Sequence, residues 1–205
     1  MNLKINKHLA SESRNKILVA AALLFARDGY YRVSVREICE SANVSKPVLY
    51  YYFKDKENLL EELVKETYLR AEELKIKHLS ATIGLEELLK GIGGMYKEFL
   101  LAYPHLTRFS AFIQSGNVPD KILLMKTERY LHEKREFVNT LKKYQKSGVL
   151  TQNVDADILF LNFIGSIIML IAEYIIMGEN HSMFSKKIDK FIDVWIKTFL
   201  IKENK

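Results

Sequence analysis

Residues 34–56 read SVREICESANVSKPVLYYYFKDK, and their spacing predicts two short helices joined by a tight turn. The first helix carries an apolar stripe at helical spacing, formed by Val35, Ile38, Cys39 and Ala42. Asn43 follows this stripe, and asparagine tolerates the positive φ that a tight turn requires. Ser34 and Ser45 each precede a helical pattern, which is where N-cap residues belong. Two helices joined in this way can cross steeply, so that the second enters a DNA major groove.

The second predicted helix, residues 46–52, presents aromatic side chains on two sides. Pro47 falls in its first turn, where the missing N–H costs little. Leu49 and Phe53 continue the buried side, whereas Tyr50 and Tyr51 point outward. A solvated pair of aromatic rings on a basic helix is typical of an interaction surface. We therefore interpret the two tyrosines as contact residues and Phe53 as part of the core.

Residues 14–64 resemble the DNA-binding domain of the TetR family of transcriptional regulators. The resemblance rests on residue types at fixed spacing, namely Ile17, Ala20, Ala21, Leu24, Phe25, Gly29, Tyr30, Ser34, Val35, Ile38, Cys39, Ala42, Val44, Ser45, Leu49, Tyr50, Tyr52, Phe53, Lys56, Glu57 and Leu59. The chain departs from the family at Asn43, where Gly is most common, at Cys39, usually Ala, and at Pro47, which is unusual in the recognition helix. The resemblance covers about the first third of the chain, and beyond it only the architecture carries over.

The resemblance implies a role for each exposed position of the second helix. In TetR-like proteins the positions matching Tyr50, Tyr52 and Lys56 meet the phosphate backbone, and those matching Lys46, Pro47 and Tyr51 reach base edges. The chemistry agrees, because hydroxyls and ammonium groups donate to phosphate, while a lysine can donate to guanine and an exposed ring can pack on a thymine methyl. Serines at helix starts can combine capping with a phosphate contact. The predicted DNA-binding residues are Ser34, Arg36, Ser45, Lys46, Pro47, Tyr50, Tyr51, Tyr52 and Lys56.

The charge of the chain is concentrated near this motif. The sequence holds 31 Lys and Arg against 25 Asp and Glu, a formal net charge of +6. Residues 1–56 hold ten basic and five acidic residues (+5), and residues 57–205 hold 21 and 20 (+1). Small proteins are often mildly basic for solubility alone, but the localisation favours nucleic acid. We predict a helix-turn-helix DNA-binding domain over residues 1–56 and an effector-binding and dimerisation domain over residues 57–205.

Hydrophobic periodicity predicts an all-α protein of about nine helices, with three in the DNA-binding domain. After a mobile arm over residues 1–12, the further helices are expected at residues 13–27, from 56 to about 82–84, and at 85–102, 104–114, 119–146, 155–177 and 185–202. The helix from Lys56 follows the motif without a linker, so we expect a rigid strut that transmits motion. Gly91, Gly93 and Gly94 can permit close packing, a kink or room for a ligand, and packing is the commonest cause.

Several function classes are disfavoured. The one cysteine, Cys39, excludes an intramolecular disulfide and is typical of a reducing cytoplasm; on a stripe predicted to be buried, it indicates core rather than a redox sensor. The N-terminus lacks the apolar segment of a secretory signal, which favours a cytoplasmic protein. The five histidines show no metal-binding spacing, and no P-loop, Rossmann or GxSxG motif is present. We expect no metal, no cofactor and no enzymatic activity.

The run over residues 158–177, ILFLNFIGSIIMLIAEYIIM, is almost wholly apolar and long enough to span a bilayer. Asn162, Ser166 and Glu173 interrupt it, and a lipid-facing Glu is expensive, so we predict that it does not cross a membrane. Together with the final helix it has too much apolar surface for one small bundle. We predict a homodimer in which the last two helices of each chain form a four-helix bundle, as TetR-like proteins do.

An effector site is implied by the resemblance. Asn162, Ser166 and Glu173 share a helix face, which indicates either a polar seam or polar groups lining a pocket. The predicted effector-binding residues are Tyr96, Phe99, Tyr103, Phe112, Met125, Asn162, Ser166, Met169 and Glu173. This apolar, aromatic lining suits a hydrophobic or amphipathic small molecule. The sequence therefore predicts a repressor released from a palindromic operator by such an effector; the alternative is a helical small-molecule-binding or membrane-associated protein without DNA binding.

Overall fold

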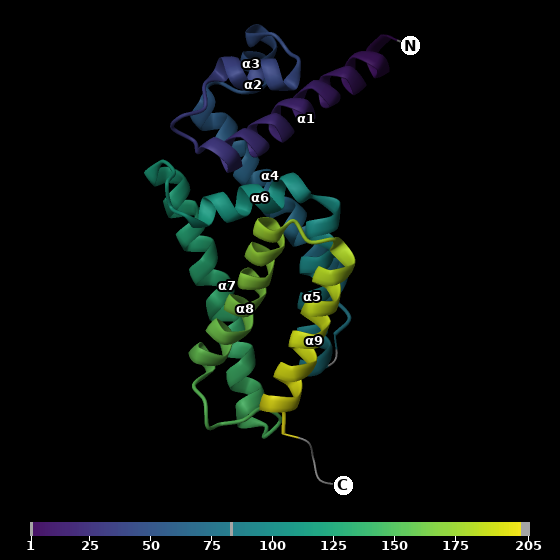
Figure 1. Cartoon of the computed structure of the whole chain (residues 1–205), viewed down its shortest axis with the longest axis vertical. Coiled ribbons are helices and arrows are strands. Elements are labelled where there is room, and N and C mark those ends of the chain that lie inside the picture. The colour runs from purple at the N-terminus through teal and green to yellow at the C-terminus, as the bar shows by residue number, and fades with distance from the viewer. Residues whose placement is uncertain (1, 83, 202–205) are drawn as a thin grey trace. The chain divides into compact units, whose positions relative to one another are not determined.

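The computed structural model describes residues 2–82 and 84–201, with side chains from Glu12 onward. This part of the chain forms nine helices and no β-strand, which confirms the predicted all-α class. The helices are α1 (Asn2–Asp28), α2 (Val35–Ala42), α3 (Lys46–Tyr52), α4 (Lys56–Leu79), α5 (Leu85–Ala102), α6 (Pro104–Gln114), α7 (Asp120–Lys146), α8 (Ala156–Met177) and α9 (His181–Phe199) (Figure 1).

The chain divides into two compact units. The first unit comprises residues 1–71 and 102–124, and the second comprises residues 72–101 and 125–205. α4 is one unbroken helix with residues in both units. The division between DNA-binding and effector domains at residues 56 and 57 stays a prediction, as does the role of α4 as a strut.

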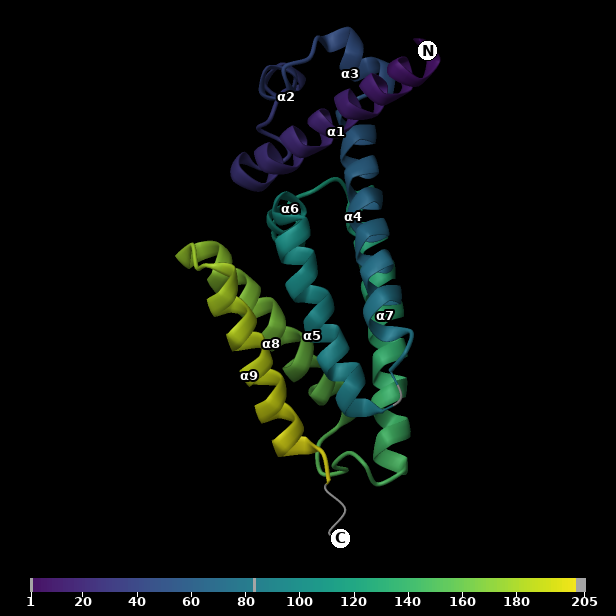
Figure 2. The ribbon, with the colours of Figure 1, turned by 90° about the vertical axis from the view of Figure 1, so that its right-hand side faces the viewer.

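α1 is the central helix of the first unit, since α2, α3 and α6 all pack against it. Figure 2 shows α6 beside α1 within this unit. The small residues Ala20, Ala21 and Ala22 are buried on α1, which lets neighbouring helices approach it closely. From α6, the buried side chains Leu106 and Phe109 complete this core. The helix-turn-helix therefore rests on a helix that is itself covered by a segment far along the sequence.

The second unit is a helical bundle in which α9 returns antiparallel to α8. Phe163 lies at the centre of its core, with ring centroids 5.3 Å from Trp195, 5.7 Å from Phe191 and 5.9 Å from Phe137. α8 begins as predicted, because the Asp155 carboxylate accepts the Asp157 backbone N–H at 2.7 Å. These aromatic contacts join α7, α8 and α9 into one core.

The glycines of α5 permit close helix packing. A Cβ added at Gly93 would overlap the Ile192 side chain of α9, and one at Gly94 would lie 2.9 Å from His78 Nδ1 on α4. At Gly91 the added atom would lie 2.7 Å from the His78 carbonyl oxygen. α5 continues as a helix through all three positions. Packing is thus confirmed as the reason for these residues.

α8 leaves much apolar surface exposed. It is the one helix in the described ranges with the length and composition to cross a membrane, with a mean hydropathy of 2.1 over its most apolar window. Only 22% of that window is buried in the single chain. The exposed apolar side chains, hereafter the α8 face, are Ile158, Leu161, Ile168, Met169, Ile176 and Met177.

Four predicted helix ends differ from the structure. α1 begins at Asn2 rather than near Ser13, because residues 2–11 contain no Gly or Pro and include good helix formers, so they do not form a separate arm. α9 begins at His181 rather than Ser185, since the Asn180 side chain accepts the Met183 N–H at 2.9 Å and caps it early. It ends at Phe199, where the chain pairs with residues 149–151 instead; Lys202, its predicted end, lies outside the described residues. α4 ends at Leu79, a few residues before the predicted stop.

Candidate nucleic-acid interface

The helix-turn-helix is built by local caps. At the start of α2, the Ser34 backbone N–H donates to Glu37 Oε2 at 2.7 Å, and the Glu37 N–H donates to Ser34 Oγ at 3.3 Å. The Ser34 hydroxyl also donates to Glu37 Oε2, at 2.6 Å. This hydroxyl and the Ser34 backbone N–H together hold the pKa of Glu37 below its usual value. At the end of α2, Asn43 adopts the left-handed conformation (φ 51°), and the Val44 N–H bonds the Cys39 carbonyl at 3.0 Å. The predicted cap at Ser34 and the turn at Asn43 are both confirmed.

α3 occupies residues 46–52 as predicted, with Pro47 in its first turn. Ser45 stands at the N-cap position with extended backbone, as predicted, although in the described structure its side chain makes no cap hydrogen bond. Its hydroxyl stays exposed.

The outer side of α3 carries the predicted contact residues. Tyr50 and Tyr51 are 50% and 79% exposed, and Lys46 and Pro47 are exposed as well. The rings of Tyr51 and Tyr52 meet edge to face with centroids 4.9 Å apart, which limits the freedom of both. The separation of an outer aromatic pair from inner core residues is confirmed, since Leu49 and Phe53 are fully buried.

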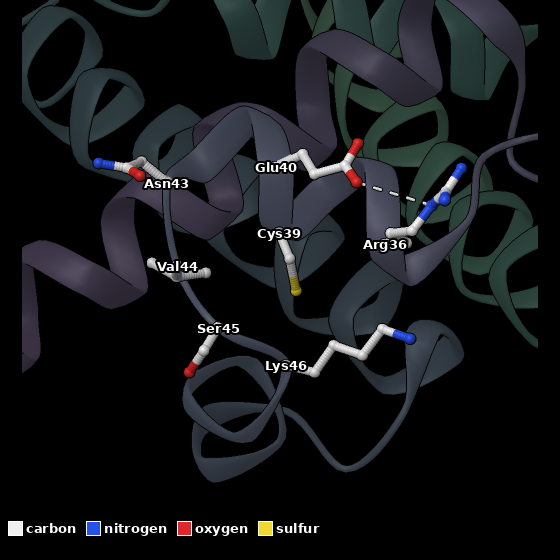
Figure 3. Close-up of a pocket in the computed structure, with 7 residues that line it drawn as sticks. All are labelled: Arg36, Cys39, Glu40, Asn43, Val44, Ser45 and Lys46. Atoms are coloured by element: carbon white, nitrogen blue, oxygen red, sulfur yellow. Dashed lines mark ion pairs between the residues drawn. The ribbon is translucent and has the colours of Figure 1, made fainter.

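A hollow of about 430 Å³ lies between α2 and α3 (Figure 3). Its lining residues are Arg36, Cys39, Glu40, Asn43, Val44, Ser45 and Lys46. In Figure 3, Cys39 extends from α2 toward Lys46, and Arg36 pairs with Glu40 at 3.6 Å. Burial raises the pKa of the Cys39 thiol, which keeps it protonated and agrees with the predicted core role.

Lys56 does not point outward with the other candidates. Its ammonium donates to the carbonyl oxygens of Tyr30 and Val33, both at 3.0 Å, and lies 4.3 Å from the Tyr30 ring centroid. Burial lowers the pKa of this lysine. Tyr52 is also only partly exposed, whereas the other predicted DNA-binding residues are exposed.

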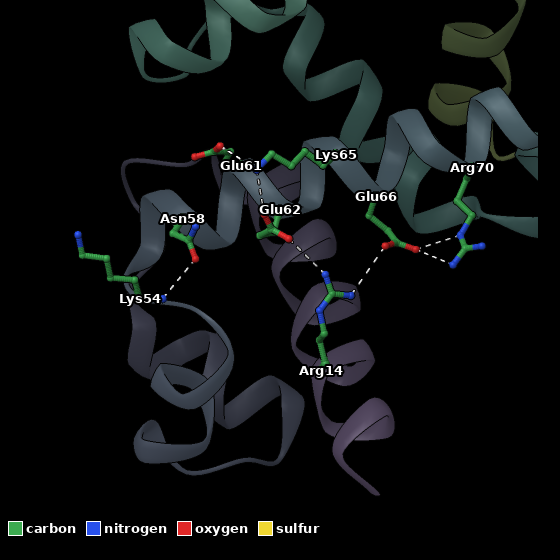
Figure 4. Close-up of polar contacts among 8 residues, drawn as sticks. All are labelled: Arg14, Lys54, Asn58, Glu61, Glu62, Lys65, Glu66 and Arg70. Atoms are coloured by element: carbon green, nitrogen blue, oxygen red, sulfur yellow. Dashed lines mark hydrogen bonds and ion pairs between the residues drawn. The ribbon is translucent and has the colours of Figure 1, made fainter. Parts of the chain in front are cut away.

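The Arg14 side chain of α1 contacts the end of α3 and the first half of α4. Its guanidinium lies 5.8 Å from the centroid of the Phe53 ring, at the C-cap of α3. Figure 4 shows the same group reaching Glu62 at 3.5 Å and Glu66 at 3.8 Å on α4, with Glu66 paired in turn to Arg70. The end of the recognition helix is thereby held against α1 and the first half of α4.

Comparison with known proteins identifies this arrangement. Residues 17–63 match the family model of bacterial regulatory proteins of the tetR family, within the 14–64 range of the resemblance. Residues 17–63 therefore carry the DNA-binding domain of the TetR family. Members of this family are transcriptional regulators rather than enzymes.

Relatives extend the match beyond the TetR motif. The chain is 36% identical over 104 residues to "Probable HTH-type transcriptional regulator YttP" of Bacillus subtilis (strain 168), and this match spans 47% of this chain and 48% of that protein, about half of each. It is 21% identical over 215 residues to "Probable acrEF/envCD operon repressor" of Escherichia coli (strain K12), covering 98% and 93%. The fold resembles that of a transcriptional regulator from Saccharomonospora viridis in complex with choline, with a TM-score of 0.73, 20% identity and coverage of 94% and 100%.

The predicted effector residues are divided between the two units. Tyr103 and Phe112 belong to the first unit, and the other seven belong to the second. Tyr103 is the N-cap of α6, and its ring lies 5.8 Å from the Arg70 guanidinium. Phe112 packs against Phe109 with centroids 6.2 Å apart. In the second unit, burial raises the pKa of Tyr96 to about 12, and Phe99 and Met125 are partly buried.

The polar residues of α8 have different surroundings. Asn162 and Met169 (69% exposed) lie on the open side of the helix, so the single chain does not enclose them. Ser166 is partly buried. The Glu173 carboxylate is paired, as a charged group among apolar neighbours should be, because Lys187 Nζ of α9 lies 3.0 Å from Glu173 Oε1. The same ammonium also pairs with Glu179. The effector role of these residues stays a prediction.

Two exposed basic residues near the TetR motif were missed by the sequence analysis. Arg32 lies in the loop between α1 and α2, and Lys54 lies between α3 and α4. Neither residue belongs to a periodic stripe or a cap. Only their position in the loops bordering the motif indicates that they could contact DNA. In the described ranges, no group of three or more His, Cys, Asp or Glu side chains has an arrangement suited to a metal ion.

Proposed function

We propose that this chain is a TetR-family repressor that binds a palindromic DNA operator as a homodimer and releases it when a small effector binds. The exposed Tyr50–Tyr51 pair beside Lys46 on α3 is the observation that carries the DNA-binding part. These side chains offer hydroxyl and ammonium donors together with flat apolar rings. That combination suits phosphate oxygens and base edges, and the excess charge of +5 over residues 1–56 attracts the polyanion.

A salt titration tests this part of the proposal. Fluorescence anisotropy measures binding to the chain's own promoter DNA and to a random duplex of equal length, between low and moderate salt. Affinity for both should fall steeply with salt, because phosphate contacts release counterions, with the promoter remaining tighter. Equal affinity for the two duplexes at moderate salt would contradict the proposal.

The α8 face supports the dimer. Its exposed aliphatic and methionine side chains carry no charge, and α8 contains no Lys or Arg. A second copy that brought the same face would bury apolar surface on both sides, as isologous interfaces do. Light scattering of the purified chain in buffer without detergent should give twice the mass of one chain. A monomer that partitions into lipid vesicles would instead favour the membrane-associated alternative.

The effector is proposed to be hydrophobic or amphipathic and to bind the larger C-terminal region, which includes the partly buried Tyr96. The relative from E. coli is named as an operon repressor, and the S. viridis regulator holds choline; both facts support a ligand-released repressor of this fold. Thermal unfolding against a panel of fatty acids, aromatic amines and quaternary ammonium compounds would find binders. An effector must weaken operator binding by the same factor by which the operator weakens effector binding. A cytoplasmic location follows from this proposal.

A further inference from the structure

Lys56 is the first residue of α4, and its side chain reaches back to the loop between α1 and α2. Its ammonium uses two of its three N–H donors on the carbonyl oxygens of Tyr30 and Val33, at 3.0 Å each. The charge also lies over the Tyr30 ring at 4.3 Å from the centroid. These contacts hold the loop at two points.

The loop held in this way sets where α2 begins. Tyr30 and Val33 are buried, whereas Tyr31 and Arg32 between them are exposed. Ser34 follows directly as the N-cap of α2, so the position of Val33 determines the position of the capping box. Because α2 packs against α3, displacement of this loop would move the first turn of the helix-turn-helix.

Without the carbonyl oxygens of Tyr30 and Val33, the position of the Lys56 ammonium would be energetically unfavourable. A positive charge in the first turn of a helix opposes the helix dipole, and burial adds a desolvation cost. Lysines that reach for phosphate are usually solvated, and Lys46 and Lys54 are exposed here. The internal contacts therefore account for the placement of Lys56 better than contact with DNA does.

We propose that Lys56 is a positioning residue, which holds the α1–α2 loop in the conformation needed for operator binding and is not itself a phosphate contact. This inference rests on the proposed DNA-binding function. It differs from the expectation drawn from the family resemblance, which assigned Lys56 to the phosphate backbone.

The substitution Lys56→Met separates the two roles. Methionine keeps an unbranched apolar stem over Tyr30 and removes the donors. We expect the melting temperature to fall by about 4–8 °C, because two charge-assisted hydrogen bonds are lost. Amide exchange over residues 29–34 should accelerate. Operator affinity should fall by roughly 5–30-fold at every salt concentration, with an unchanged slope of log affinity against log salt.

The matched control is Lys54→Met, which removes an exposed lysine charge two residues earlier. Its melting temperature should stay within about 1 °C of the parent. Lys56→Arg is the second variant, because arginine replaces lysine at a phosphate contact but its planar guanidinium fits poorly between the two carbonyls. We expect Lys56→Arg to lose operator affinity and loop protection as Lys56→Met does.

A salt slope that decreases in magnitude by about 0.9 in Lys56→Met would show a lost phosphate contact and overturn the inference. Full operator affinity in Lys56→Arg would overturn it as well. If the parent chain failed to prefer its promoter, the proposed function would fall. The thermal and exchange measurements would still decide the loop-holding role, since unchanged exchange over residues 29–34 in Lys56→Met would exclude it.

Discussion

Helices α3 and α8 both expose large apolar side chains, but the chemistry of the two surfaces differs. On α3 the exposed rings of Tyr50 and Tyr51 carry hydroxyl groups and lie beside Lys46. On α8 the large exposed apolar side chains are aliphatic or methionine, Asn162 is exposed among them, and the helix has no basic residue. Exposed apolar surface with donors and positive charge suits a polyanion, whereas exposed apolar surface without charge suits another apolar surface.

The two surfaces also differ in how they are supported. α3 is a short helix whose position depends on Asn43, the Ser34 capping box and Phe53 beneath it. α8 is 22 residues long, and its inner side is anchored by Phe163 in the aromatic core of the second unit. Substitutions on α3 should therefore change how DNA is read, and substitutions on the α8 face should change the number of chains in the particle.

The largest effect is expected from Ile168→Glu on the α8 face. An unpaired carboxylate there opposes burial against a second copy, so the chain should become monomeric. A monomer holds only one recognition helix, and loss of the second half-site should weaken operator binding by about 100-fold or more. Light scattering gives the mass, and anisotropy gives the affinity.

Ile76→Glu is the control for this change, because Ile76 on α4 is also exposed. That variant should retain the dimer mass and operator affinity. If Ile168→Glu stayed dimeric, the contrast between α3 and α8 would be broken, because the α8 face would then not be the subunit interface.

A smaller effect is expected from Lys46→Ala on α3. Loss of a donor to a base edge should relax the preference at one base pair by about 1–3 kcal/mol, with other positions unchanged. Binding to a library of operators with single base-pair changes measures this preference. Uniform weakening across the library would show that Lys46 contacts phosphate instead of a base edge. The dimer mass measured by light scattering should not change in this variant.

Tyr50→Phe should have a more modest effect. It removes only the hydroxyl, so operator affinity should fall by about 3–10-fold to a similar extent for all sequences, as expected for one lost phosphate hydrogen bond. The same operator library serves as the assay. A change of sequence preference in Tyr50→Phe would place this hydroxyl at a base edge.

The smallest effect concerns the capping box that supports α2. Folding lowers the pKa of Glu37, so its ionised form stabilises the fold above the unfolded pKa of about 4.3, and this stabilisation is lost as pH falls through the folded value. Glu37→Gln should lower the melting temperature by about 2 °C at pH 7, with the difference shrinking toward pH 3. Glu40→Gln, at an exposed carboxylate, is the control. A difference that persists at pH 3 would contradict the assigned role of the charge.

Much of the DNA-binding region was predictable because its signals are local. The cap at Ser34, the turn at Asn43 and the inward side of α3 at Leu49 and Phe53 were all confirmed. Each depends on residues within one or two helical turns, where spacing translates directly into position. The start of α9 was misjudged because Asn180, five residues upstream of the expected N-terminus, is a better cap than the residues nearer Ser185.

Contacts between distant segments were not predictable in the same way. The inward turn of Lys56 depends on carbonyl oxygens at Tyr30 and Val33, more than twenty residues earlier. A lysine in sequence looks the same whether its ammonium meets solvent, phosphate or a carbonyl. The partner of Glu173 presented the same difficulty, since Lys187 is reached only when α9 folds back on α8.

The sequence by itself determined the class of the protein, the helix-turn-helix and the exposed tyrosines of α3, because helical period, caps and turn residues act over a few positions. Only the tertiary structure decided that α6 covers α1, that Gly93 admits Ile192, and that Lys56 serves the α1–α2 loop. The physical reason is that burial and hydrogen bonding depend on which surfaces meet, and that is settled by packing between segments far apart in the chain.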